Sequence, residues 1–190
     1  MALLVIGLHV CFWSPFLVRG HLDKRAGVGS SGPAAHQSAA ATALVWLHTL
    51  ALGVTYLGLA LGLGPVEEWA FPMPARLVGV PMVVATTYMI VRVMMVFRSW
   101  RLRAVLTADH QLCTDGPFRV IRHPIYAGLV LLTIASFLLV PNWVTAAGIL
   151  TNFVAGDVRS RAEERLLVAA FGDRYRAYMG RTRRLLPGVY

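Results

Sequence analysis

Residues 116–126 read Gly-Pro-Phe-Arg-Val-Ile-Arg-His-Pro-Ile-Tyr, and residues 159–167 read Arg-Ser-Arg-Ala-Glu-Glu-Arg-Leu-Leu. Each of these two charged clusters lies directly beside an apolar run that is long enough to enter a bilayer. Charge held beside hydrocarbon costs several kcal/mol unless it is paired or solvated, so ionisable groups at such positions usually belong to a functional site. The apolar runs decide the fold, and the two clusters are the first candidates for function.

The composition is that of an integral membrane protein. Of the 190 residues, 57% are apolar and 14% are charged, whereas soluble domains average about 45–50% apolar and about 25% charged residues. Mean hydropathy is +0.61. The net charge of +9 comes from 18 basic residues, 17 of them arginine, which lie in the gaps between apolar runs. Such a layout marks the cytoplasmic side of a membrane protein, so no nucleic-acid partner is expected.

Five apolar runs, over residues 2–18, 42–63, 75–97, 124–140 and 143–156, predict an all-α, polytopic bundle of about five transmembrane helices. The second and third runs can cross a ~30 Å hydrocarbon core as helices. Only Pro141 and Asn142 separate the short fourth and fifth runs, which predicts a tight helical hairpin. Because the first run lacks a preceding basic segment and a following small-residue cleavage site, it is interpreted as a retained helix and not as a signal peptide.

The chain is divided into an N-terminal region of three spans, residues 1–100, and a region of two spans and a C-terminal helix, residues 101–190. Residues 169–190 carry aromatic side chains at helical spacing among arginines, which predicts an amphipathic interfacial helix that ends at Pro187. With the N-terminus outside, 16 of the 18 basic residues fall on the cytoplasmic side, leaving Arg76 and Arg92. The nearly lysine-free composition suggests a bacterium with GC-rich DNA, and hence its inner membrane.

Two further patterns concern packing and redox state. Gly58 and Gly62 form a small-xxx-small pair in the second span, which permits close helix contact. Cys11 lies in an apolar span and Cys113 in a basic loop, so both are expected to be unpaired.

The first cluster is placed to bind an anion. Pro124 suits the first turn of the fourth helix, which puts Arg122 and His123 just before a helix N-terminus and Tyr126 inside the first turn. Helix N–H groups and a guanidinium together form a receptor for a carboxylate or phosphate, and His123 can donate a hydrogen bond or transfer a proton. The alternative is an interfacial Arg-His-Tyr belt that only anchors the helix end.

The second cluster continues directly from the fifth span. Arg159 and Glu163 are four residues apart and share one helix face, while Glu164 points about 100° away from Glu163. A solvated charged face is the plain interpretation of such a run. Its position at the membrane boundary instead suggests that a buried Arg–Glu pair holds the polar end of a substrate while Glu164 receives a cation.

These residues resemble the isoprenylcysteine carboxyl methyltransferase family. The resemblance rests on Arg-His-Pro-x-Tyr-x-Gly at 122–128, Glu-Glu-x-x-Leu at 163–167, Phe-Gly-x-x-Tyr-x-x-Tyr at 171–178 and a late Pro187. It covers about residues 109–187 and extends to related phospholipid and thiol methyltransferases. It implies a membrane enzyme that uses S-adenosylmethionine, bound in a cytoplasm-facing cavity between the last helices and the C-terminal segment.

The resemblance also assigns roles to residues, and no metal is among them. Arg159 and Glu163 match the pair at the methyl-accepting end of the substrate. The implied cofactor contacts are His110, Gln111, Leu112, Cys113, Phe118, Arg122, His123, Pro124, Ile125, Tyr126 and Glu164. Phe118 occupies a position where the family has tyrosine, so only ring packing is expected there.

The expected function is therefore methyl transfer from S-adenosylmethionine to a lipidic or small apolar acceptor that enters from the bilayer among membrane lipids. The acceptor group, whether carboxylate, thiol or amine, stays open. Membrane sterol reductases, which use NADPH, share features of the C-terminal half and form one alternative. A non-enzymatic lipid-binding membrane protein forms the other.

Overall fold

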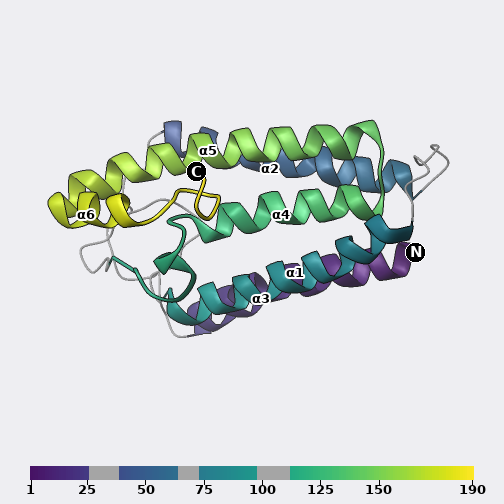
Figure 1. Ribbon diagram of the computed structural model, residues 1–190, viewed down its shortest axis with the longest axis horizontal. Coiled ribbons are helices and arrows are strands. Elements are labelled where there is room, and N and C mark those ends of the chain that lie inside the picture. Colours follow the sequence, from purple (N-terminus) through teal and green to yellow (C-terminus); the bar gives the residue numbers. More distant parts are fainter. Residues whose placement is uncertain (26–38, 64–72, 98–111) are drawn as a thin grey trace.

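The computed structural model describes residues 1–25, 39–63, 73–97 and 112–190. Within these ranges the chain is helical, without strands. The helices are α1 (Ala2–Arg25), α2 (Ala39–Gly62), α3 (Met73–Val96), the 3-10 helix η1 (Gly116–Arg119), α4 (Pro124–Leu139), α5 (Trp143–Phe171) and α6 (Asp173–Arg181). Figure 1 shows the long helices running side by side. The predicted all-α polytopic bundle is confirmed.

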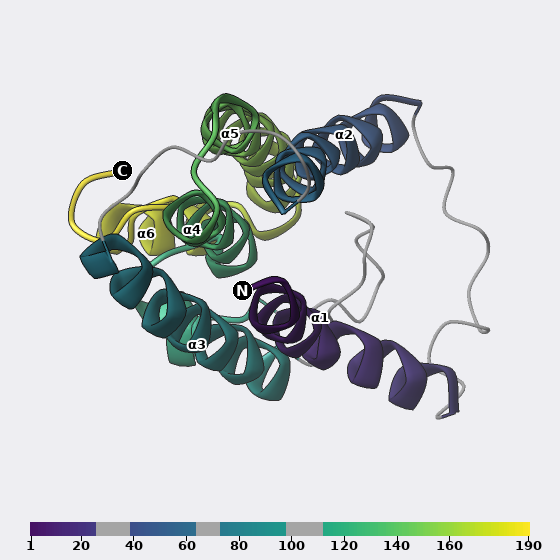
Figure 2. The same ribbon diagram turned by 90° about the vertical axis from the view of Figure 1, so that its right-hand side faces the viewer.

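The central element is α4. It packs between α3 and α5, while α1 lies against α3 and α2 lies against α5 (Figures 1 and 2). Its side chains Leu129, Leu132, Ala135 and Leu139 are buried and form much of the apolar core. The residues at the start of α4 are therefore held in the middle of the molecule.

Three helices of the described chain, α1, α2 and α3, are long and apolar enough to cross a membrane. The apolar helix α4 has 16 residues, which gives about 24 Å at 1.5 Å per residue, shorter than a full span. The helix that begins with the fifth apolar run extends beyond residue 156, because α5 continues as one helix to Phe171. The charged second cluster is thus a direct extension of an apolar helix, as the sequence indicated.

The predicted hairpin between α4 and α5 is confirmed, and Asn142 fixes it. Its side-chain oxygen accepts hydrogen bonds from the N–H groups of Val144 and Thr145, which caps α5. Its amide nitrogen donates to the carbonyl oxygen of Gly58 on α2 at 2.9 Å. One side chain therefore begins α5 and ties it to α2.

Close contact between α2 and α5 depends on the two glycines that the sequence singled out. A Cβ atom at Gly58 would lie 2.6 Å from the backbone nitrogen of Thr145, and one at Gly62 would lie 2.4 Å from Val140. Further along the interface, the amide of the fully buried Asn152 donates to the carbonyl oxygen of Ala51 at 2.9 Å. The small-xxx-small pair thus packs α2 against the α4–α5 turn.

The amphipathic helix predicted over residues 169–190 is shorter than expected. Gly172, with φ of +54°, separates α5 from α6, and α6 ends at Arg181 instead of Pro187. The reason is that the following backbone pairs with the segment before α4: the Arg122 N–H donates to the Arg183 carbonyl at 2.7 Å. Residues 182–190 consequently return to the bundle.

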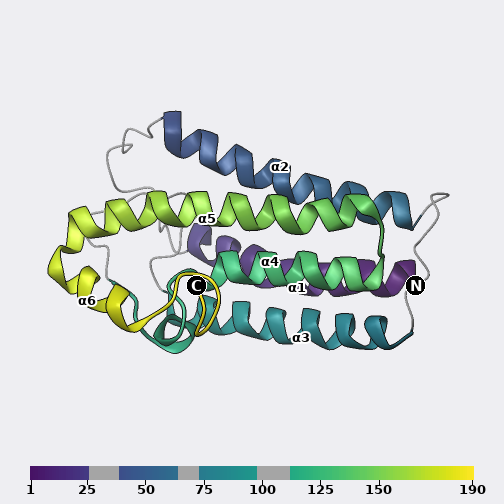
Figure 3. The same ribbon diagram turned by 45° about the horizontal axis from the view of Figure 1, so that its top comes forward.

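Both charged clusters lie at one end of the bundle. Figure 3 shows the C-terminal ends of α1 and α3, the N-terminal ends of α2 and α4, and α6 at this same end. The last turn of α1 adds Lys24 and Arg25 there. The end that carries the clusters is thus the strongly basic end, as the predicted topology requires.

We expect Gly58→Ala to lower the free energy of unfolding by about 1–3 kcal/mol, because the added methyl group meets backbone atoms that cannot rotate away. Thermal unfolding of the purified protein in detergent measures this. Gly53→Ala is the matched control, since a Cβ at Gly53 on the same helix meets nothing within 4 Å. Equal stability of the two variants would contradict the close packing of α2 on α5.

Candidate functional site

The segment before α4 and the C-terminal segment form a short two-stranded contact. Besides the Arg122 bond, the His123 N–H donates to the Arg184 carbonyl at 3.1 Å, and the Arg183 N–H donates to the Val120 carbonyl at 3.2 Å. These bonds fix the backbone on both sides of Arg122 and Arg184. The side chains of the two segments therefore face α5 from defined positions.

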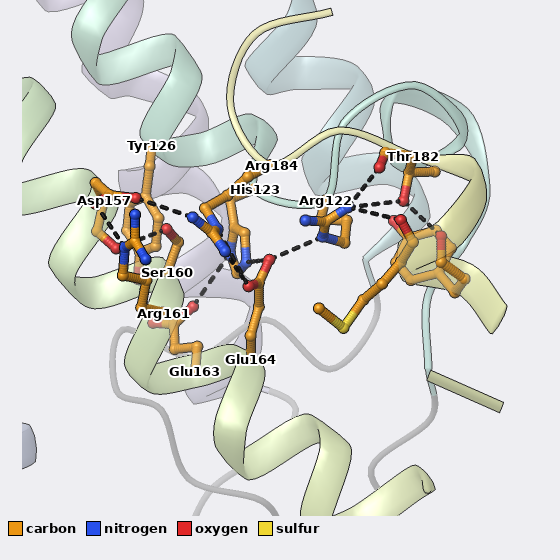
Figure 4. A network of polar contacts seen from close by, with 12 residues as sticks. Arg122, His123, Tyr126, Asp157, Ser160, Arg161, Glu163, Glu164, Thr182 and Arg184 are labelled. Atoms are coloured by element: carbon orange, nitrogen blue, oxygen red, sulfur yellow. Dashed lines mark hydrogen bonds and ion pairs between the residues drawn. The ribbon is translucent and has the colours of Figure 1, made fainter. Parts of the chain in front are cut away.

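Glu164 of α5 is held between two guanidinium groups. Its Oε1 accepts from Arg122 Nε at 2.8 Å, and its Oε2 accepts from Arg184 Nη2 at 2.8 Å (Figure 4). Only 4% of the residue is exposed. Burial raises the pKa of this carboxyl, but the adjacent His123, Arg184 and Arg122 outweigh burial and lower it. Glu164 is thus ionised and joins three segments.

Arg122 also reaches the end of α6. Its Nη1 donates to the carbonyl of Met179 at 3.1 Å and to the carbonyl of Thr182. The guanidinium that the sequence placed at an open anion receptor is therefore engaged within the protein. Its observed contacts connect the start of α4 to α5 and to the C-terminal end of α6.

Tyr126 and Glu163 form the second half of the site. The Tyr126 hydroxyl donates to Glu163 Oε1, and Arg159 Nη2 lies 3.7 Å from the same oxygen. The Arg159 guanidinium also lies over the Tyr126 ring, 5.0 Å from its centroid. The predicted pairing of Arg159 with Glu163 on one helix face is therefore present, and Tyr126 of α4 completes it.

His123 lies between the two carboxylates. Its Nδ1 is 3.6 Å from Glu163 Oε2, its Nε2 is 3.5 Å from Glu164 Oε1, and its ring stacks on Tyr126. Burial lowers the pKa of His123, but the nearby carboxylates of Glu163 and Glu164 outweigh burial and raise it. His123 thus connects the Glu164 half of the site to the Tyr126–Glu163 half.

A hollow of about 380 Å³ opens on the other side of Glu164, between α5, α6 and the C-terminal segment. It is lined by Arg161, Glu164, Arg165, Val168, Met179 and Arg184. This lining combines cations, one carboxylate and two apolar side chains. It can therefore hold a ligand that has an anionic end and an apolar part.

The structure brings together most of the predicted site. Arg122, His123, Tyr126, Arg159, Glu163 and Glu164 meet in one network, and Pro124 is the first residue of α4 as expected. Ile125 packs against the core beside this network.

The other predicted cofactor residues lie toward α3 or outside the described residues. The Phe118 ring contacts Phe97 at 5.3 Å, and its carbonyl accepts from the Tyr178 hydroxyl at 2.6 Å. Cys113 Sγ lies 3.7 Å from the carbonyl of Val96 at the end of α3, and neighbouring Leu112 is half-buried. Cys11 and Cys113 are both unpaired. His110 and Gln111 lie outside the described residues.

Sequence reasoning missed Arg184, Tyr190 and Asp157. The Tyr190 hydroxyl donates to Asp157 Oδ1 at 2.7 Å and accepts from Arg184 Nη1 at 2.6 Å. The spacing of Asp157 and Arg161, four residues apart, could have indicated one ion pair of this group. The partners from the C-terminal segment had no local signal, because tertiary backbone pairing places them.

The elevated pKa of His123 predicts how stability depends on pH. A raised pKa means that the folded state holds the proton more tightly than the unfolded state, whose imidazole titrates near 6.5. The free energy of unfolding of wild type should exceed that of His123→Gln by its full amount below about pH 6. This difference should decline as pH rises through the pKa of His123 in the folded state. Unfolding in detergent from about pH 6 to about pH 9 measures the difference, and a constant difference would contradict a charged His123.

Comparison with known proteins agrees with this geometry. Residues 77–169, from α3 through most of α5, match the isoprenylcysteine carboxyl methyltransferase (ICMT) family. The match contains the two charged clusters and begins earlier in the chain than the motifs alone indicated.

One similar protein is the protein-S-isoprenylcysteine O-methyltransferase of Schizosaccharomyces pombe, which is 34% identical over 73 residues. The aligned stretch covers 37% of this chain and 30% of the yeast protein. Residues 77–169 of this chain are thus similar to the isoprenylcysteine carboxyl methyltransferase family, and the chain covers less than a third of the yeast relative's length.

Proposed function

We propose that this protein is an integral membrane methyltransferase, which transfers the methyl group of S-adenosylmethionine to a lipidic acceptor. The main support is the contact between Tyr126 and Glu163, because two clusters 37 residues apart meet in one buried polar network at the end of an apolar bundle. Burying such charges is costly, and a working site is the usual reason for it. The family match over the same residues supports the same reaction class.

The residues present fit S-adenosylmethionine, which carries a carboxylate, an ammonium and a sulfonium together with an apolar adenosine. Arg161, Arg165 and Arg184 line the hollow and suit the carboxylate, while Val168 and Met179 offer apolar contact. When bound, the donor supplies an electrophilic methyl group on its sulfonium. His123, Tyr126 and the adjoining cofactor residues named from the resemblance would border it.

Glu163 is better placed than Glu164 to receive a positive group of the donor. Both oxygens of Glu164 accept from guanidinium groups at 2.8 Å. Glu163 has weaker cationic contacts, with Arg159 at 3.7 Å and His123 at 3.6 Å. In this proposal Glu164 holds the site together, and Glu163 faces the reacting groups.

Arg159 would orient the acceptor. Its side chain is 14% exposed and is held by Glu163 and the Tyr126 ring. Methyl transfer is an in-line displacement, for which alignment alone can supply roughly 7–11 kcal/mol of the barrier reduction. A carboxylate acceptor needs no base, whereas an amine or thiol must lose a proton, for which Glu163 is the candidate.

The basic end of the bundle would face the cytoplasm, following the positive-inside rule, and the membrane would be a bacterial inner membrane. An acceptor with a long apolar tail could then reach the site from the inner leaflet. The name of the yeast relative makes an isoprenylcysteine carboxylate the first acceptor to test.

The direct test incubates purified protein with methyl-labelled S-adenosylmethionine and, separately, N-acetyl-S-farnesylcysteine, a phospholipid amine and a total lipid extract. We expect saturable donor binding and one product that gains a labelled methyl group, identified by mass spectrometry. Absence of donor binding and of transfer would overturn the proposal. NADPH binding with reduction of a sterol would assign the protein to the alternative class.

A second prediction tests whether Glu163 takes part in turnover. Glu163→Gln keeps the size of the side chain but removes its charge. We expect turnover to fall about 10²-fold or more, and donor affinity to fall by a smaller factor, because Glu163 faces a positive group of the donor. The exposed Asp173→Asn on α6 is the matched control for loss of one negative charge. Equal losses of turnover, donor affinity and stability in Glu163→Gln would indicate a purely structural carboxylate.

A further inference from the structure

His48 of α2 is a buried imidazole that the proposed mechanism has not used. It is 2% exposed, and neither ring nitrogen has a hydrogen-bond partner among the described residues. Buried polar groups in folded proteins nearly always have partners, and each exception calls for an explanation. His48 also lies outside the segment that matches the family.

A second buried histidine of this bundle, His9, has a hydrogen-bond partner for each ring nitrogen. His9 of α1 is 6% exposed, its Nδ1 lies 2.9 Å from the carbonyl oxygen of Val5, and its Nε2 lies 3.0 Å from the hydroxyl of Ser136. His9 thus joins α1 to α4 through polar contacts on both nitrogens. His48 has the same burial without such contacts.

His48 lies against the site. Its ring centroid is 5.4 Å from that of Tyr126, the residue whose hydroxyl donates to Glu163. A Cβ atom at Gly156 of α5 would lie 3.9 Å from His48 Cε1 and 3.4 Å from Tyr126 Cβ. The absence of a side chain at Gly156 lets α5 pass close to both rings, one helical turn before Arg159.

The neighbours of His48 on α2 face outward. Trp46, Leu47 and Leu50 are exposed, and α2 diverges from α5 toward its N-terminal end (Figures 2 and 3). An apolar chain at this surface would lie beside α2, and its polar end would meet the Tyr126–Arg159 pair from the α2 side.

We propose that His48 is a positioning residue on the acceptor side of the site and hydrogen-bonds the polar head group of the methyl acceptor. The proposal rests on the proposed methyltransferase function. A neutral imidazole offers one N–H donor and one acceptor nitrogen. The Arg159 guanidinium and the His48 N–H are both donors, so together they suit a head group rich in acceptor oxygens. Arg159 would bind part of this head group, and His48 would supply one further hydrogen bond.

Steady-state kinetics with N-acetyl-S-farnesylcysteine tests this role. His48→Phe keeps a ring of similar size and removes both nitrogens, so we expect the KM for this acceptor to rise about tenfold, the effect of one lost hydrogen bond. The KM for the donor should stay unchanged. His48→Gln, which can still donate and accept, should restore most of the affinity.

His9→Phe is the matched control, because it removes a buried histidine of another membrane helix that lies away from the acceptor. We expect it to lower stability and leave the KM for the acceptor unchanged. An acceptor KM for His48→Phe equal to that of wild type overturns the proposal and leaves the methyltransferase function standing.

A measurement on the wild-type protein avoids dependence on a variant that folds poorly. In protein with ¹³C-labelled histidine, the ring signal missing from His48→Gln is assigned to His48. Adding the same acceptor should shift this signal and leave that of His9 in place. If the protein methylates the acceptor but the His48 signal does not move, the proposal is overturned. If wild type neither methylates nor binds the acceptor, both this proposal and the proposed function are overturned.

Discussion

The ion pairs of Glu164 with Arg122 and Arg184 hold the site together. Arg122 precedes α4, Glu164 belongs to α5 and Arg184 belongs to the C-terminal segment. Each group is mostly shielded from water, so the loss of Glu164 would leave the Arg122 cation without its carboxylate partner, an effect of about 3–5 kcal/mol in measured cases. The position of Glu163 follows from this anchor, because the adjacent residue on the helix must then face Tyr126 and His123.

The bundle itself explains why these charges can exist at this place. Apolar α4 is surrounded by α3 and α5, and its first turn begins where the hydrocarbon-like core ends. The charges on α5 begin at the corresponding level, since α5 continues without a break from its apolar half. Polar groups at this boundary are shielded enough to interact strongly and near enough to water to receive a charged ligand.

Local spacing predicted much of the fold and part of the site. The apolar runs indicated the helices, Pro141 and Asn142 indicated the hairpin, and the four-residue spacing of Arg159 and Glu163 placed both on one face. All of these are properties of short stretches of chain.

What the sequence could not predict are contacts between distant segments. Arg184 meets Glu164 because residues 183–184 pair with residues 120–123, and that pairing also ends α6 before Pro187. The helical periodicity of residues 169–190 gave no sign of it. His48 carried a weak signal, as a polar residue within an apolar helix, but only the packing of α2 against α4 and α5 shows which groups it faces.

The turn at Gly172 constrains the chain that follows it. Its φ of +54° lies in a region that side chains disfavour, and there α5 gives way to α6, which leads the chain back toward α4. Between this turn and Arg184 the path is fixed at both ends. Insertion or deletion of one residue there would shift the Arg184 guanidinium away from Glu164, whereas exposed side chains of α6 can be exchanged freely. The geometry of the site therefore depends on the length of this interval more than on the identity of its exposed residues.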